Sequence, residues 1–281
     1  MLPLRVILTY AEKQLASGPH PERARWDAEL LLYHALGRDR AWLLAHTNHG
    51  IEVKQGERYD ALLARRATGE PIQYITGETE FYGLPFRVTP DVLIPRPETE
   101  HLVEKALELA SNFPAPRIVD IGTGSGAIAV ALAHHLPNAQ IAAIDLSHSA
   151  LAIARENAKC NDAAIRFLEG DLLAPVAGER FEFVVSNPPY VPAADRASLS
   201  VEIRDYEPAL ALFAGDDGLD IYRRLIPAAF DAIIPGGFLI LEIGYGQSPA
   251  ITELLARSGF EQIDFVPDLQ NIPRVACGRR P

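Results

Sequence analysis

The sequence contains few cysteines, and this limits both disulfide and metal chemistry. Only Cys160 and Cys277 occur among its 281 residues, and neither belongs to a CxxC pair. Two isolated cysteines cannot build a disulfide framework, so a reducing cytoplasm is the expected compartment. The eight histidines show neither HExxH nor HxH spacing, and we therefore expect no metal site.

Positive charge and long apolar runs are also scarce. Basic residues number 26 against 37 acidic ones, which gives a formal net charge of −11 at pH 7. Proteins that grip nucleic acid through its phosphates depend on Lys and Arg, so direct nucleic-acid binding is not expected. No stretch approaches the roughly 18 apolar residues of a membrane helix. The first apolar run ends at Glu12, too early for a signal core, and we expect a soluble, unexported protein with no membrane partner.

The first 70 residues carry the apolar spacing of a small helical bundle. Leu4, Leu8, Ala11 and Leu15 fall on one helical face, and later segments repeat the pattern before glycine stops. Apolar residues make up 48% of the whole chain, enough to bury a sizeable core. We therefore predict an N-terminal helical bundle over residues 1–70.

The rest of the chain changes from a linker to an alternation of strands and helices. Residues 71–95 are rich in β-branched and aromatic residues with Gly and Pro breaks, which predicts a β-hairpin linker. Over residues 96–281, strand-like runs alternate with helical segments, which predicts right-handed crossovers and a parallel sheet. Only a short loop separates the last two strands, so they should pair antiparallel at one edge. The expected fold class is α/β, with a doubly wound, mostly parallel sheet and an antiparallel edge strand.

A glycine-rich turn follows the first strand of this second region. Gly122, Gly124 and Gly126 allow a sharp turn and a close approach to a ligand, at the edge where open α/β sheets bind ligands. Asp145 ends the next strand about 20 residues later, where its carboxylate can accept both ribose hydroxyl protons of an adenosine-type ligand. With Ala127 the turn also satisfies the looser dinucleotide pattern GxGxxA, so NAD and S-adenosylmethionine both fit.

The tetrad Asn187-Pro188-Pro189-Tyr190 follows the fourth strand at the same edge of the sheet. Two consecutive prolines fix two φ angles and cannot continue a strand, so they hold Asn187 rigidly. The Asn187 side-chain oxygen and the Pro188 carbonyl can accept the two protons of a planar NH2 group, which directs its lone pair at a methyl donor. Tyr190 can stack on that group and exclude water. The tetrad predicts methyl transfer to an amide or arylamine nitrogen, with positioning as the main contribution to catalysis.

Three other kinds of protein share part of this pattern. A nicotinamide-dependent oxidoreductase would use the glycine turn, but it needs a catalytic Tyr-Lys or His partner, and the four lysines lie near no suitable tyrosine. A module that only senses the cofactor would leave the tetrad unexplained. A DNA or RNA adenine methyltransferase would use the same tetrad, but it must also flip a base, which normally needs a basic groove.

The glycine turn, the strand ending at Asp145 and the SNPPY sequence at Ser186–Tyr190 together resemble class I S-adenosylmethionine-dependent methyltransferases. More specifically, the chain resembles the peptide chain release factor glutamine methyltransferases over nearly its whole length. The ribosomal-protein glutamine methyltransferases share the chemistry and the linker pattern, and they are the nearest alternative. The segments that carry the resemblance are GEPIQYITG from Gly69, FYGLPFRVTPDVLIPRPETE from Phe81, RDYEPALAL from Arg204 and GDDGLDIYRRL from Gly215.

The resemblance implies N5-methylation of the glutamine in the Gly-Gly-Gln motif of bacterial class 1 release factors, a protein methylation linked to translation termination. S-adenosylmethionine would be the methyl donor and S-adenosylhomocysteine the product. Because the helical bundle is an accessory region with no chemistry of its own, we expect it to contact the release factor. The substrate glutamine would be held by the whole tetrad, and Asn187, Pro188 and Tyr190 would be its catalytic members. The cofactor would contact the glycine turn, two strand ends and the tetrad, through Gly122, Thr123, Gly124, Ser125, Gly126, Asp145, Asp171, Leu172 and Asn187.

Overall fold

The computed structural model describes residues 2–281, which form two compact units. Unit 1 comprises the chain up to Gly77 together with Leu199–Tyr206, and unit 2 comprises Glu78–Ser198 and Glu207–Pro281. Each unit has hydrophobic core residues of its own. The two units are therefore described separately.

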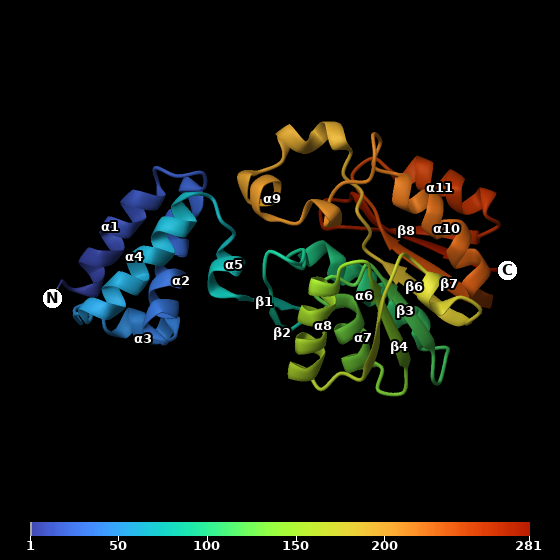
Figure 1. Ribbon diagram of the computed structural model, residues 1–281, viewed down its shortest axis with the longest axis horizontal. Helices are drawn as coiled ribbons and strands as arrows, with labels where there is room; N and C mark the ends of the chain where they lie inside the picture. Colours follow the sequence, from blue (N-terminus) through green and yellow to red (C-terminus); the bar gives the residue numbers. More distant parts are fainter. Residues whose placement is uncertain (1) are drawn as a thin grey trace. The chain divides into compact units, whose positions relative to one another are not determined.

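Unit 1 is a helical bundle, and its core contains the apolar face predicted for the first helix. Leu4, Leu8, Ala11 and Leu15 are at most 4% exposed and belong to one buried cluster with residues of the other long helices. Helices α1, α2 and α4 lie side by side (Figure 1). The helices of unit 1 are α1 (Leu4–Leu15), α2 (Ala24–Leu36), α3 (Arg40–Ala45), α4 (Val53–Ala67), α5 (Ile72–Thr76) and α9 (Val201–Tyr206).

Helix α9 belongs to unit 1, although the residues on either side of it in the sequence belong to unit 2. The buried guanidinium of Arg66 donates hydrogen bonds to Asp27 and Glu202, each at 2.6 Å. The hydroxyls of Thr68 and Tyr206 form a further hydrogen bond at 2.7 Å. The segment after the Asn187 tetrad is thereby fastened to the N-terminal helices.

The segment between the bundle and the first parallel strand contains a tight hairpin. Strands β1 (Glu78–Phe81) and β2 (Leu84–Arg87) pair antiparallel across Tyr82-Gly83, both of which have positive φ, as short hairpin loops favour. The predicted linker began at residue 71, yet Ile72–Thr76 is helical. Pro71 stands at the start of this helix, and Gly77 ends it in a left-handed conformation.

Unit 2 is built on a seven-stranded sheet with the order β5-β4-β3-β6-β7-β9-β8. The strands from β5 to β7 pair in parallel, whereas β9 runs antiparallel to both β7 and β8. The predicted α/β fold is confirmed, and the reversed strand, β9, lies one position in from the edge. The strands are β3 (Arg117–Ile121), β4 (Gln140–Asp145), β5 (Ile165–Glu169), β6 (Phe181–Ser186), β7 (Ile233–Glu242), β8 (Glu261–Pro267) and β9 (Pro273–Arg279).

Helices cover both faces of this sheet. Neighbouring strand residues point to opposite faces, so Phe183 packs in the cluster that contains α6 and α7, whereas Val184 packs in the cluster that contains α10 and α11. Figure 1 shows α6, α7 and α8 on one side of the sheet and α10 and α11 on the other. No helix within residues 2–281 is both long enough and apolar enough to cross a membrane. The helices are α6 (Glu100–Ala110), α7 (Ala127–His135), α8 (His148–Cys160), α10 (Asp220–Ala232) and α11 (Ser248–Arg257).

Candidate active site

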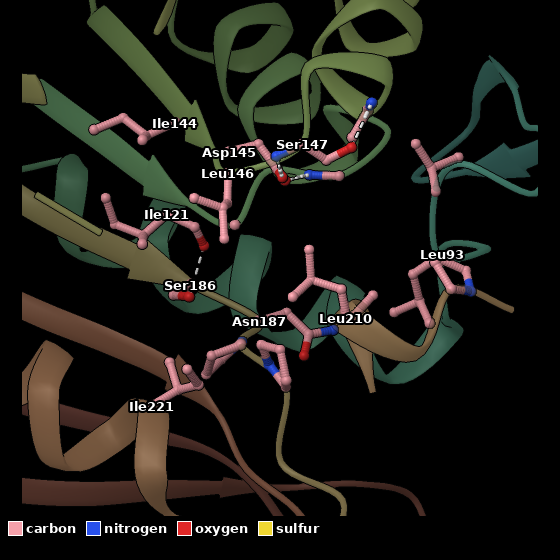
Figure 2. Close-up of a pocket in the computed structure, with 18 of the residues that line it drawn as sticks. Leu93, Ile121, Ile144, Asp145, Leu146, Ser147, Ser186, Asn187, Leu210 and Ile221 are labelled. Atoms are coloured by element: carbon pink, nitrogen blue, oxygen red, sulfur yellow. Dashed lines mark hydrogen bonds between the residues drawn. The ribbon is translucent and has the colours of Figure 1, made fainter. Parts of the chain in front are cut away.

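A pocket opens at the carboxyl ends of β3, β4 and β6, three strands that run parallel. Its empty volume is about 940 Å³, which includes space open to solvent. Figure 2 shows Asp145 and Leu146 on one side of the cavity and Asn187 on the other. The predicted site residues that line it are Gly122, Gly124, Asp145, Asp171, Leu172, Asn187, Pro188 and Pro189.

The first two glycines of the glycine turn face this pocket. Gly122 and Gly124 have φ values of 69° and 56°, and a Cβ at either position would meet no atom within 4 Å. Their backbone therefore borders open space that a ligand can approach closely. Gly126 also has a positive φ, but a Cβ there would lie 3.2 Å from the Cβ of Ala154 in α8. This third glycine serves the packing of α7 against α8.

The remaining predicted residues of the turn, Thr123 and Ser125, hydrogen-bond to neighbouring residues of the protein and thereby stabilise the turn. The Thr123 hydroxyl donates to Asp120 at 2.6 Å, and the Ser125 carbonyl accepts from the Asn157 side chain at 2.8 Å. Complete burial, with a smaller contribution from the charge of Asp145, raises the pKa of Asp120 to about 7. Of the predicted site residues within the described chain, four lie outside the pocket lining: Thr123, Ser125, Gly126 and Tyr190.

Asp145 is held at the pocket by the backbone of its own surroundings. Its Oδ2 accepts from the Gly124 N–H and its Oδ1 from the Ser147 N–H, each at 2.8 Å. Burial raises the pKa of Asp145, while these two hydrogen bonds lower it. Because each carboxylate oxygen has a second lone pair, Asp145 retains the capacity to accept hydroxyl protons from a ligand.

A second acid borders the pocket after β5. Asp171 pairs through Oδ2 with Arg224 of α10, and Leu172 follows it with a positive φ of 49°. Both residues line the pocket.

The tetrad borders the pocket immediately after β6. Ser186 anchors this strand end, because its hydroxyl donates to the Ile121 carbonyl of β3 at 2.7 Å. Asn187 Nδ2 donates to the Thr99 hydroxyl at 3.1 Å, which leaves Oδ1 as the acceptor atom of this side chain. Pro188 is buried and Pro189 is half-buried, and both line the pocket.

A buried acid lies behind the tetrad. Glu242, at the end of β7, accepts hydrogen bonds from the Thr99 hydroxyl at 2.5 Å and from the Tyr190 hydroxyl at 3.2 Å. Burial raises the pKa of Glu242 to about 7, although both hydrogen bonds act to lower it. Sequence reasoning missed Thr99 and Glu242. For Glu242, the signal available in the sequence was a single acidic residue within the apolar run of β7.

Comparison with known proteins assigns the chain to a family. Residues 7–77 match the PrmC N-terminal domain and residues 99–203 match the methyltransferase small domain. The release factor glutamine methyltransferase of Geobacter sulfurreducens is 44% identical over 276 residues, which are 98% of this chain and 96% of that protein. The protein of the same name from Koribacter versatilis is 43% identical, over 95% of this chain and 94% of its own length. The chain belongs to the release factor glutamine methyltransferases.

The solved structure of the T. thermophilus 16S rRNA N2 G1207 methyltransferase, in complex with AdoMet and guanosine, has the same fold. Its TM-score is 0.54 at 18% identity, over 73% of this chain and 50% of that one. The likeness concerns the fold alone, which is that of class I methyltransferases. The family and the fold together make this chain a methyltransferase.

In this release factor glutamine methyltransferase, two of the segments that carry the family resemblance meet at the pocket. Arg96 of PRPETE donates to both carboxylate oxygens of Glu207, each at 2.5 Å. The ion pair fixes the chain just before Pro208 and Leu210, which line the pocket. Among residues 2–281, no group of three or more His, Cys, Asp or Glu side chains is arranged to hold a metal ion.

Proposed function

We propose that this methyltransferase transfers a methyl group from S-adenosylmethionine to the side-chain amide nitrogen of a glutamine in peptide chain release factors. The observation that carries the proposal is the edge of the pocket formed by Asn187, Pro188 and Pro189, which offers acceptors for a planar NH2 group. The name shared by the relatives supplies the class of acceptor protein. The Gly-Gly-Gln motif of class 1 factors is the glutamine that the family resemblance implies.

The residues around the pocket fit S-adenosylmethionine. Asp145 would accept the ribose hydroxyls, Asp171 and Leu172 would contact the adenine, and Gly122 and Gly124 would border the methionine part. When bound, this cofactor supplies an electrophilic methyl group on a sulfonium sulfur. The chain's own contribution is to present the acceptor nitrogen to that methyl group.

Asn187 and Pro188 would present it by holding the two protons of the substrate amide. The nitrogen lone pair then forms the new N–C bond, while the electron pair of the breaking S–C bond stays on sulfur. Orientation of this kind can be worth up to about 7–11 kcal/mol, and the same acceptors stabilise the positive charge that develops on nitrogen. The methylated amide cation is acidic enough to lose its proton to water without a dedicated base. Stacking of Tyr190 on the substrate stays a prediction.

We assign recognition of the release factor to the helical unit, which carries none of the residues that line the pocket. Large side chains of this unit are exposed and can anchor a protein partner, among them Tyr10, Trp26 and Val53. We also propose the cytoplasm as the place of the reaction, because a release-factor substrate would be found there.

Label transfer from radiolabelled S-adenosylmethionine tests the proposed function. The acceptors are a release factor with the intact motif, the same factor with Gly-Gly-Gln changed to Gly-Gly-Ala, ribosomal protein and bulk nucleic acid. We expect label on the intact factor alone. Label on ribosomal protein or nucleic acid would overturn the acceptor while keeping the chemistry, and no label anywhere would overturn the proposal.

A further inference from the structure

The side chain of Asn187 can serve the proposed reaction in only one of the two orientations of its amide group. With the oxygen directed at the substrate, it accepts a proton of the substrate amide. In the opposite orientation its own NH2 would face the substrate NH2, and two hydrogen-bond donors cannot pair. In the structure, Nδ2 donates a hydrogen bond to the Thr99 hydroxyl at 3.1 Å. A hydroxyl can either donate or accept, so Thr99 alone does not determine which end of the amide faces it.

Glu242 removes that ambiguity. Its Oε2 lies 2.5 Å from the Thr99 hydroxyl oxygen, and an ionised carboxylate can only accept. The single hydroxyl proton of Thr99 must therefore point at Glu242, which leaves Thr99 to accept from the NH2 of Asn187. We propose that Glu242, acting through Thr99, is a positioning residue that keeps the Asn187 oxygen directed at the substrate amide, an inference that rests on the proposed function.

The carboxylate of Glu242 is itself firmly placed. Glu242 is only 2% exposed, and its backbone lies opposite Val275 in the antiparallel pairing of β7 with β9. The Tyr222 hydroxyl donates to the Glu242 backbone carbonyl at 2.7 Å. The second carboxylate oxygen accepts from the Tyr190 hydroxyl at 3.2 Å, so the same acid also ties down the last residue of the tetrad.

Protonation of Glu242 would release the constraint. A neutral carboxyl can donate to Thr99, after which Thr99 can donate in turn and the Asn187 amide can adopt the opposite orientation. Glutamine at position 242 has the same freedom, because its NH2 donates. Glu242→Gln therefore mimics the protonated state without removing the side chain.

Several ionisable groups surround Glu242. Burial and, to a smaller extent, the charge of Glu98 raise its pKa, whereas the hydrogen bonds of Thr99 and Tyr190 and the charge of Arg274 lower it, and the net pKa is about 7. The phenol of Tyr222, whose pKa is raised by burial, stays neutral beside it. The ionised state that orients Asn187 is therefore lost as the pH falls through about 7.

Nuclear magnetic resonance of the free protein tests the inference without any acceptor. The side-chain NH2 signals of Asn187, identified by their absence from Asn187→Ala, should shift in wild-type protein with a midpoint near pH 7. The shift should be absent from Glu242→Gln and from Thr99→Val, and Thr99→Ser should restore it because it keeps the hydroxyl. An unchanged titration in Glu242→Gln would overturn the inference, whatever the acceptor of the enzyme proves to be.

Kinetics provides the second test, in which the ratio of wild-type to Glu242→Gln kcat is followed against pH. Well above pH 7 we expect this ratio to be about 10 to 100, and well below pH 7 we expect it to approach 1. The KM for the release factor and the affinity for S-adenosylhomocysteine should be unchanged in the variant. Tyr222→Phe is the control, because it removes a bond to the Glu242 backbone and leaves the carboxylate in place. A ratio independent of pH, or an equal loss of kcat in Tyr222→Phe, would show a merely structural role and overturn the inference.

Discussion

At the scale of single residues, two buried acids stand behind the two halves of the site. Asp120 lies behind the glycine turn and bonds to Thr123, whereas Glu242 lies behind the tetrad and bonds to Thr99. Burial raises the pKa of each acid to about 7. Burial makes ionisation of a carboxyl group unfavourable. We therefore expect each acid to produce a measurable pH dependence of stability or activity.

Asp120→Asn should flatten the pH dependence of the free energy of unfolding. The pKa of Asp120 rises from 3.8 to about 7 on folding, so the native state holds this proton more tightly than the unfolded chain. Its stabilising contribution is complete below about pH 4 and is lost as the pH rises to about 7. Denaturant unfolding across this interval should show a larger decline for wild type than for Asp120→Asn. Parallel curves for the two proteins would rule out the assignment.

Asn187→Ala should lower kcat by on the order of a hundredfold to a thousandfold, because it removes a preorganised acceptor. The affinity for S-adenosylhomocysteine should stay within about tenfold of wild type, as Asp145 and the glycine turn are untouched. Isothermal titration and steady-state kinetics measure the two quantities. Asn112→Ala, at an exposed asparagine, is the matched control. Wild-type kcat in Asn187→Ala would remove the tetrad from the mechanism.

At the scale of elements, the carboxyl edge of the sheet could be predicted because its signals are local. Apolar runs end at Ile121, Asp145 and Ser186, and a turn or tetrad follows directly in the sequence. The Thr99–Glu242 contact could not be predicted, since it joins residues 143 apart that only the folded sheet brings together. The place of β9 between β7 and β8 likewise depends on pairing across the fold.

The turn before α10 holds the end of the tetrad, and Gly218→Ala should disturb it. Gly218 has a φ of 75°, and a Cβ there would lie 2.2 Å from the Tyr190 carbonyl oxygen. Gly246 has a φ of 76° but open space around it, so Gly246→Ala is the matched control. Both variants should lose about 1–3 kcal/mol of stability from backbone strain, but only Gly218→Ala should also lose kcat. Equal kcat values in thermally intact protein would refute this coupling.

At the scale of the whole molecule, the chain crosses between its units more often than its sequence suggests. The segment Leu199–Tyr206 leaves the catalytic unit after the tetrad, forms α9 in the helical unit and returns at Glu207. Arg66 and Glu202, the partly buried pair that holds α9, are 136 residues apart. Neither the helical spacing of apolar residues nor a turn motif indicates a contact between residues so far apart in the sequence. The sequence alone therefore predicts residues 1–70 as an independent bundle.

Arg66→Met should loosen α2 and α9 together. Arg66 and Asp27 each have side chains only 2% exposed, so losing the guanidinium leaves the buried Asp27 with only its longer ion pair, at 3.6 Å, to Arg23. Removing one partner of a buried ion pair typically costs about 3–5 kcal/mol, and the contact with Arg23 should reduce this cost. Arg65→Met is the control, since the Arg65 side chain is 45% exposed and its ion pair with Glu70 should contribute less than about 1 kcal/mol. Hydrogen exchange followed by mass spectrometry should show lost protection in both helices for Arg66→Met alone. Unchanged protection of α9 would contradict this account of its anchoring.

Fragmentation mass spectrometry of the product shows most directly which atom receives the methyl group. A release factor is incubated with S-adenosylmethionine and either wild-type protein or Asn187→Ala, then digested, and the peptide containing Gly-Gly-Gln is sequenced. We predict a single added methyl group on the side-chain nitrogen of that glutamine with wild-type protein, and a strongly reduced yield with the variant. A methyl group on any other atom, or an equal yield from Asn187→Ala, would contradict the proposed chemistry.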